Sequence, residues 1–140
     1  MARESTVSII DDILKNSRTI AVVGASSNPK RDSNRIFKYL LDAGYMVVPV
    51  NPGETEVHGQ KAYPDLRSVP VKVDVVDIFR RPEAVPGIVE EAIAIGVKAV
   101  WMQLGIRHAA AARKAREAGL KVVQDRCIYV EHFKRYGNKR

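Results

Sequence analysis

Residues 19–33 read TIAVVGASSNPKRDS, and this stretch decides how the rest of the chain is interpreted. An apolar run ends at Gly24, a loop of small polar residues follows, and an amphipathic helix begins near Ser33. This order predicts a buried strand, a glycine turn and a helix N-terminus. Free N–H groups at the start of a helix bind phosphates, and Lys30 and Arg31 add positive charge there. We therefore expect a phosphate-binding loop, with a plain tight strand–helix turn as the alternative.

The loop departs from two common nucleotide-binding patterns. A dinucleotide loop reads G-x-G-x-x-G/A and is followed about 20 residues later by an acid that binds the ribose. Here Ser26 and Pro29 occupy the second and third glycine positions, and the next strand ends in Val50-Asn51-Pro52 without an acid. The P-loop pattern G-x-x-x-x-G-K-[ST] is also absent. The sequence thus favours a ligand with an extra phosphate over NAD.

Composition indicates an ordinary globular domain. The 140 residues are 46% hydrophobic and 28% charged, which predicts one domain with its core at about residues 10–133 and a basic tail at 134–140. There is no signal-peptide pattern and no apolar run of about 20 residues, so we expect no membrane partner. The single cysteine, Cys127, excludes an internal disulfide and fits a reducing, cytoplasmic location. The net charge is +7, but the cations are dispersed and only 6% of residues are aromatic, which argues against nucleic acid.

Strands and helices alternate along the chain. Apolar runs predict strands at 19–23, 45–50, 73–79, 97–102 and 120–124, and helical periodicity predicts helices at 5–16, 33–43, 82–95, 108–118 and 126–133. We therefore expect an α/β fold, a single-domain Rossmann-like doubly wound parallel sheet of about five strands with helices on both faces. Pro49 places the second strand at or near an edge.

Ligands in such folds bind at the carboxyl ends of the strands. The residues predicted there as ligand-binding are Gly24, Ala25, Ser26, Ser27, Arg31, Ser33, Asn51, Pro52, Phe79, Arg80, Arg81, Gln103, Gly105 and Ile106. Arg31 is a candidate anion clamp, whereas Ser33 is equally well explained as a helix N-cap.

No catalytic or metal-binding pattern accompanies these residues. His58, His108 and His132 are scattered without metal-ligand spacing, and we interpret them as surface or capping residues. No catalytic triad, paired carboxylates or C-x-x-C pattern occurs, so we expect neither catalytic residues nor a metal.

With these motifs, the chain resembles the small stand-alone CoA-binding proteins of bacteria and archaea. Their Rossmann domain is similar to the N-terminal CoA-binding domain of the succinyl-CoA synthetase alpha subunit. The resemblance covers about residues 10–133 and is carried by Val23–Ser26, Pro29-x-Arg31-x-Ser33, Val50–Pro52, Val75–Arg80, Val100–Ile106 and Asp125–Cys127.

The resemblance implies coenzyme A or acyl-CoA as the ligand. It places the pyrophosphate on the Gly24–Ser26 loop with Arg31 near phosphate, and Asn51 and Pro52 beside the nucleotide. Phe79, Arg80 and the 103–106 loop follow the length of the ligand.

The resemblance also bears on catalysis. The synthetase needs a second domain with a phosphorylated histidine and a partner subunit, and nothing after residue 133 supplies them. We therefore expect binding without catalysis. The alternatives are an NAD(P)-dependent enzyme and an acyl-CoA-sensing regulatory module that acts through a protein partner. The acyl group and the oligomeric state stay open. For Cys127 the alternatives are a buried, inert cysteine, which is the more common case, and a thiol that forms a mixed disulfide with the ligand.

Overall fold

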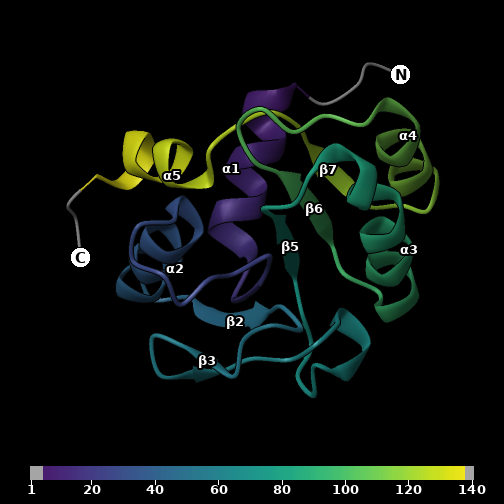
Figure 1. The fold of residues 1–140 in the computed structure, drawn as a ribbon. Coiled ribbons are helices and arrows are strands. Elements are labelled where there is room, and N and C mark those ends of the chain that lie inside the picture. The colour runs from purple at the N-terminus through teal and green to yellow at the C-terminus, as the bar shows by residue number, and fades with distance from the viewer. Residues whose placement is uncertain (1–4, 138–140) are drawn as a thin grey trace.

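The computed structural model describes residues 5–137, which form a parallel five-stranded sheet flanked by helices (Figure 1). The strand order is β2-β1-β5-β6-β7, so the chain winds outward in both directions from β1 and β5. The strands are β1 (Thr19–Val23), β2 (Met46–Val50), β5 (Val75–Ile78), β6 (Ala99–Met102) and β7 (Lys121–Val123). The prediction of a Rossmann-like α/β fold is confirmed.

The helices cover both faces of the sheet. They are α1 (Thr6–Asn16), α2 (Asp32–Asp42), α3 (Val85–Ile95), α4 (Ala109–Glu117) and α5 (Ile128–Tyr136). Helices α1, α2 and α5 contribute to one apolar core, and α3 and α4 contribute to the other, as their places on either side of the sheet in Figure 1 indicate. Both faces are therefore buried, which explains why the strands read as continuous apolar runs.

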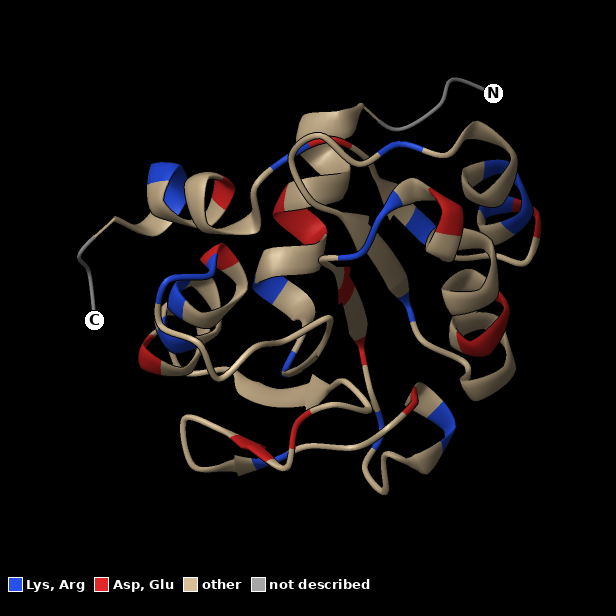
Figure 2. Ribbon diagram, viewed as in Figure 1, with Lys and Arg blue, Asp and Glu red and all other residues tan. Residues whose placement is uncertain are grey.

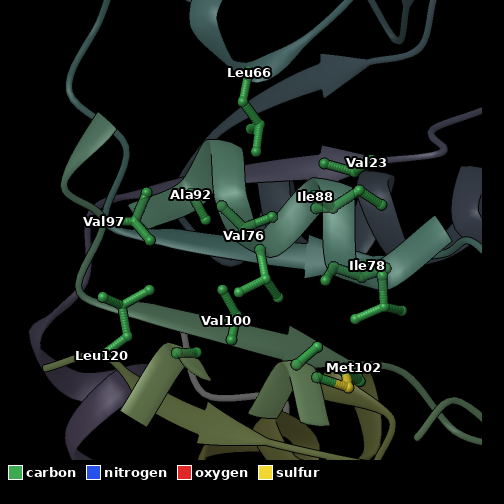
Figure 3. Close-up of a cluster of buried hydrophobic side chains, with 14 of the residues drawn as sticks. Val23, Leu66, Val76, Ile78, Ile88, Ala92, Val97, Val100, Met102 and Leu120 are labelled. Carbon is green, nitrogen blue, oxygen red and sulfur yellow. The ribbon is translucent and has the colours of Figure 1, made fainter. Parts of the chain in front are cut away.

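Alternate strand residues supply the two cores. Val76 and Val100 point to the α3 and α4 side, where Figure 3 shows them beside Ile88 and Ala92 of α3. Trp101 belongs to the opposite core and is fully buried. Side chains of a strand point alternately to opposite faces, so each strand packs against the helices on both sides of the sheet.

Short elements interrupt the predicted pattern. Residues after β2 form a small hairpin, β3 (Glu56–Val57) with β4 (Gln60–Lys61), followed by the 3₁₀ turn η1 (Leu66–Ser68). The helix predicted from residue 82 is divided into a 3₁₀ turn, η2 (Pro82–Ala84), and α3. The predicted tail is also changed, because residues 134–136 belong to α5, while residues 138–140 lie outside the described part of the chain.

The edge position predicted from Pro49 is confirmed. Strand β2 ends the sheet, and the Pro49 carbonyl accepts a hydrogen bond from the Tyr63 amide at 3.0 Å. Proline has no N–H to donate to a ladder, so it is tolerated at an edge. Among residues 5–137, no helix is both long enough and apolar enough to cross a membrane.

Candidate ligand-binding cleft

A cavity of about 510 Å³ opens where β1, β2 and β5 end. We call it the loop cavity, because the loop between β1 and α2 forms most of its wall. Its lining residues are Gly24, Ser26, Lys30, Arg31, Asp32, Ser33, Asn51 and Phe79.

The N-terminus of α2 faces this cavity without a side-chain cap. Arg31 is the N-cap residue and offers no oxygen, whereas Ser5 caps α1 and His108 caps α4. Ser33 lies inside the first turn, so its alternative interpretation as the N-cap is wrong. An uncapped helix start presents free N–H groups and partial positive charge. The cavity is therefore suited to an anion.

Two cations strengthen this electrostatic character. Lys30 and Arg31 line the cavity, are exposed, and form no side-chain hydrogen bond or ion pair with any residue in the 5–137 range. Asp32 also lines it, but its carboxylate pairs with Arg35. The charges of Lys30 and Arg31 are thus available to a ligand.

Side chains from neighbouring elements hold the loop in shape. The Asn51 amide donates to the Ala25 carbonyl at 2.8 Å, and the Asn34 amide donates to the Ser26 carbonyl at 2.9 Å. The Ser27 N–H donates to the Glu54 carboxylate at 2.9 Å. An acidic side chain, that of Glu54, therefore reaches the loop from the segment after β2. It does not stand at the end of the strand, where the dinucleotide-binding pattern places the ribose-binding acid.

Gly24 is required by the protein backbone. It has a φ of +91°, and a Cβ atom placed on it would lie 2.5 Å from the Phe79 carbonyl oxygen. Only glycine adopts such a φ readily, and such a contact is closer than atoms tolerate. The structure adds a second reason for this glycine, the close approach of the backbone to the Phe79 carbonyl just after β5, while its approach to a ligand stays a prediction. Gly24 is also the only glycine in residues 19–33.

A second cavity of about 340 Å³ continues along the edge of the sheet, and Asp32 and Phe79 line both. We call it the side cavity. Its lining residues are Asp32, Ile36, Phe79, Arg80, Arg81, Gln103, Leu104, Ile106 and Cys127. The side chains of Arg80 and Arg81 have no partner within the described residues. Because the two cavities share Asp32 and Phe79, we call them together the cleft; the loop cavity is its anion-suited end and the side cavity its more apolar end.

The loop after β6 is fixed by Asp125. Its carboxylate accepts the Gly105 N–H at 2.6 Å and lies 3.2 Å from the Arg107 Nε. The Gly105 hydrogen bond first, and Arg107 second, hold the pKa of Asp125 below its ordinary value. This contact positions the loop that carries Leu104 and Ile106 to the side cavity.

Most of the predicted binding residues meet in this cleft. Those that line it are Gly24, Ser26, Arg31, Ser33, Asn51, Phe79, Arg80, Arg81, Gln103 and Ile106. Four others do not: Ala25 is buried, Ser27 binds Glu54, Pro52 is exposed beyond the turn, and the Gly105 N–H binds Asp125.

The sequence interpretation missed two lining residues, Asp32 and Ile36 of α2, which only the fold brings to the cleft. Lys30, Leu104 and Cys127 also line the cleft. The sequence interpretation named them as a charge, as part of the 103–106 loop and as a partner for the ligand thiol, without including them among the binding residues.

A larger cavity of about 970 Å³ lies near the starts of β1 and β2. Two of its tyrosines use their hydroxyls within the protein: the Tyr39 hydroxyl lies 2.7 Å from His132 Nδ1, and the Tyr45 hydroxyl donates to the Leu14 carbonyl. This cavity lies at the opposite end of the strands from their carboxyl ends, where ligands of such sheets bind. His132 is buried, and burial lowers its pKa, so its interpretation as a surface or capping residue is wrong. We therefore place the candidate site in the cleft.

One buried carboxyl stands apart from all these contacts. Asp77 on β5 is 0% exposed, and neither oxygen has a hydrogen-bond partner. Burial raises the pKa of Asp77 well above its ordinary value. Its neighbours across the sheet are Val22 and Trp101, so the surroundings of the carboxyl disfavour its charged form.

The placement of the described side chains does not favour a metal site. Among the described residues, no group of three or more His, Cys, Asp or Glu side chains is placed to hold a metal ion. The residues of the cleft are instead suited to an anionic organic ligand.

Fold and cleft together define a Rossmann-like domain whose strand ends surround a cationic cleft. Residues 18–133 match the family model described as the CoA binding domain, and the chain belongs to that family.

Relatives of this family occur alone and as parts of ligases. The chain is 40% identical to the uncharacterized protein YneT of Bacillus subtilis, over 88% of this chain and 91% of YneT. A solved hypothetical protein from Pyrococcus horikoshii is 43% identical, with a TM-score of 0.89 and 96% of each chain covered. The alpha subunit of the ADP-forming acetate–CoA ligase II of Pyrococcus furiosus is 40% identical over 64% of this chain, which spans only 20% of that subunit.

Proposed function

We propose that this protein binds coenzyme A or an acyl-CoA in the cleft. The observation that carries the proposal is the uncapped N-terminus of α2, which opens into the loop cavity beside Lys30 and Arg31. Coenzyme A carries a pyrophosphate and a 3′-phosphate, and these groups match free amides and unpaired cations. Membership of the CoA-binding domain family supports the same ligand.

The shape and polarity of the cleft support the same assignment. The loop cavity takes the phosphates, and the side cavity, with Ile36, Phe79, Leu104 and Ile106 in its wall, takes the less polar arm. Arg80 and Arg81 stand at the side cavity with their charges unused. A cleft with exposed cations and an apolar wall suits a long amphipathic ligand better than a simple phosphate ion.

We further propose that binding is the whole of the activity. The cleft brings together cations, small polar groups and apolar side chains, and no nucleophile–base pair is formed among its lining residues. An acyl-CoA-sensing role through a protein partner is compatible with this proposal, because it requires binding and no chemistry.

Calorimetric titration tests the proposal with four ligands: coenzyme A, dephospho-CoA, NAD and NADP. Coenzyme A is expected to bind more tightly than dephospho-CoA, because the 3′-phosphate adds a charge to the cationic cleft. No binding of coenzyme A would refute the proposal, and tighter binding of NADP than of coenzyme A would establish the dinucleotide alternative.

A further inference from the structure

We propose that Cys127 forms a mixed disulfide with the thiol end of the ligand, so that the cleft retains coenzyme A covalently under oxidising conditions. This inference rests on the proposed function. Cys127 is the only cysteine in the chain, is partly exposed, and lines the side cavity. No second cysteine competes with an incoming thiol, so any disulfide must be made with another molecule.

The side cavity has a polar group suited to the arm that ends in this thiol. Gln103 is only 4% exposed, and its Oε1 accepts the Ile128 amide at 3.0 Å. The Ile128 N–H can donate only to an oxygen, so the other end of the Gln103 amide is the nitrogen, Nε2. That Nε2 has no acceptor within residues 5–137. Gln103 lines the side cavity, so this donor can meet an acceptor on a ligand bound there.

The chemistry of coenzyme A matches this pair of residues. Its arm contains amide carbonyls that accept hydrogen bonds, and it ends in a thiol. An arm that starts at the loop cavity reaches the side cavity past Asp32 and Phe79, which line both. Gln103 then donates to an arm carbonyl, and the terminal sulfur lies on the cavity wall that contains Cys127.

The step is a thiol–disulfide exchange with CoA disulfide as the co-reactant. The Cys127 thiolate attacks one sulfur of CoA disulfide, the sulfur–sulfur bond breaks, and one coenzyme A leaves as a thiolate that takes up a proton. One disulfide is consumed and one is formed, so no further oxidant is needed. A reducing thiol reverses the reaction by the same route.

Intact mass spectrometry of the folded protein after incubation with CoA disulfide tests the inference. The expected result is one CoA adduct per chain that dithiothreitol removes and that Cys127→Ser lacks. Acetyl-CoA has no free thiol and occupies the same cleft, so it is expected to slow the reaction. Cystamine, a disulfide without the nucleotide, is expected to react at least about tenfold more slowly, because it is not held in place.

The outcomes separate this inference from the proposed function. Calorimetric binding of reduced coenzyme A to the natural chain, measured in the same preparation, reports on the proposed function separately. Normal binding without an adduct on the natural chain would overturn the inference and leave the function intact. Equal rates with cystamine and CoA disulfide would also overturn it, because they would mean that Cys127 is merely accessible.

Gln103→Glu tests the positioning role. The variant keeps an oxygen for the Ile128 amide and replaces the nitrogen donor with a second oxygen. It is expected to weaken coenzyme A binding about tenfold or more while leaving adenosine 3′,5′-bisphosphate, which has no arm, unaffected. Equal weakening of both ligands, with an unchanged melting temperature, would exclude a contact between Gln103 and the arm.

Discussion

Replacing Asp77 by asparagine is expected to stabilise the protein increasingly as the pH rises. Asp77 is fully buried with neither oxygen partnered, and burial raises the pKa of its carboxyl well above the ordinary 3.8. Above pH 3.8 the unfolded chain releases this proton while the folded chain keeps it. The folded state then binds more protons, so its free energy of unfolding falls as the pH rises, until the buried carboxyl itself ionises.

The size of the effect follows from the proton difference. One proton held only by the folded state lowers the free energy of unfolding by about 1.4 kcal/mol per pH unit. Asparagine is nearly the same size, remains neutral and is equally unpartnered. The two chains should therefore have similar stability near pH 4, and the advantage of Asp77→Asn should grow above that pH, by at most about 1.4 kcal/mol per pH unit while the folded carboxyl keeps its proton.

Urea denaturation at each pH measures this difference, with fluorescence of the single, buried Trp101 as the probe. Asp74→Asn is the matched control on the same stretch. Burial acts to raise the pKa of Asp74, but hydrogen bonds from the Arg18 and Thr19 amides outweigh it, so the pKa is lowered. That carboxylate stabilises the fold above pH 3.8, and its contribution is lost only as the pH falls further. Asp74→Asn should therefore cost a constant amount between pH 5 and pH 6.

A difference between Asp77→Asn and the natural chain that does not change over the same interval would refute the reasoning. It would mean that the Asp77 carboxyl is ionised, or paired, in the folded protein in solution.

Three further changes test the cleft. Gly24→Ala should lower the free energy of unfolding by more than about 2 kcal/mol, since a positive φ is strained and the new Cβ meets the backbone at the end of β5; a loss under about 0.5 kcal/mol by urea denaturation would contradict this. Arg31→Ala should weaken coenzyme A about tenfold and reduce the salt dependence of binding, whereas Arg113→Ala on α4 should do neither by calorimetry. Asp125→Ala should speed hydrogen exchange in the 103–106 loop. The natural chain should show the same faster exchange only below pH 3.8, where the carboxylate with the lowered pKa becomes protonated. Unchanged exchange in the variant would mean that the Asp125 contact does not hold the loop.

The order of elements was readable from the sequence because parallel strands buried on both faces leave uninterrupted apolar runs. The Gly24 turn and the proline of β2 gave correct local signals for the same reason: each depends on backbone geometry that few residue types allow. The ends of elements were less accurate. Strand β5 is Val75–Ile78, shorter than the predicted 73–79, and the carboxylate of Asp74 just before it accepts the amides of Arg18 and Thr19.

Contacts between segments that are far apart in the chain could not be predicted from the sequence. Nothing in the local pattern indicates that Glu54 returns to the Ser27 amide, or that His132 is buried beside Tyr39. The isolated carboxyl of Asp77 was likewise interpreted as part of an apolar strand, without a sign that it would have no partner. Each case depends on which segments the fold brings together.

The cations of the cleft lie at separate points in the sequence. Figure 2 shows Lys and Arg at many places over the fold, in agreement with the dispersed charge expected from the sequence. Their grouping at the cleft arises from the junctions after β1 and β5, which supply Lys30 and Arg31 and then Arg80 and Arg81. Net charge alone could not have distinguished these four from the other basic residues.

The side-chain hydrogen bonds that hold the loop after β1 have a consequence for the kinetics of binding. Asn34, Asn51 and Glu54 form hydrogen bonds with successive residues of this loop. A ligand of the proposed kind would therefore meet a loop that the protein itself holds in place, and the entropy lost on association would come chiefly from the ligand. Encounter should follow a single exponential without an induced-fit phase, and affinity differences among acyl derivatives should reside in the dissociation rate.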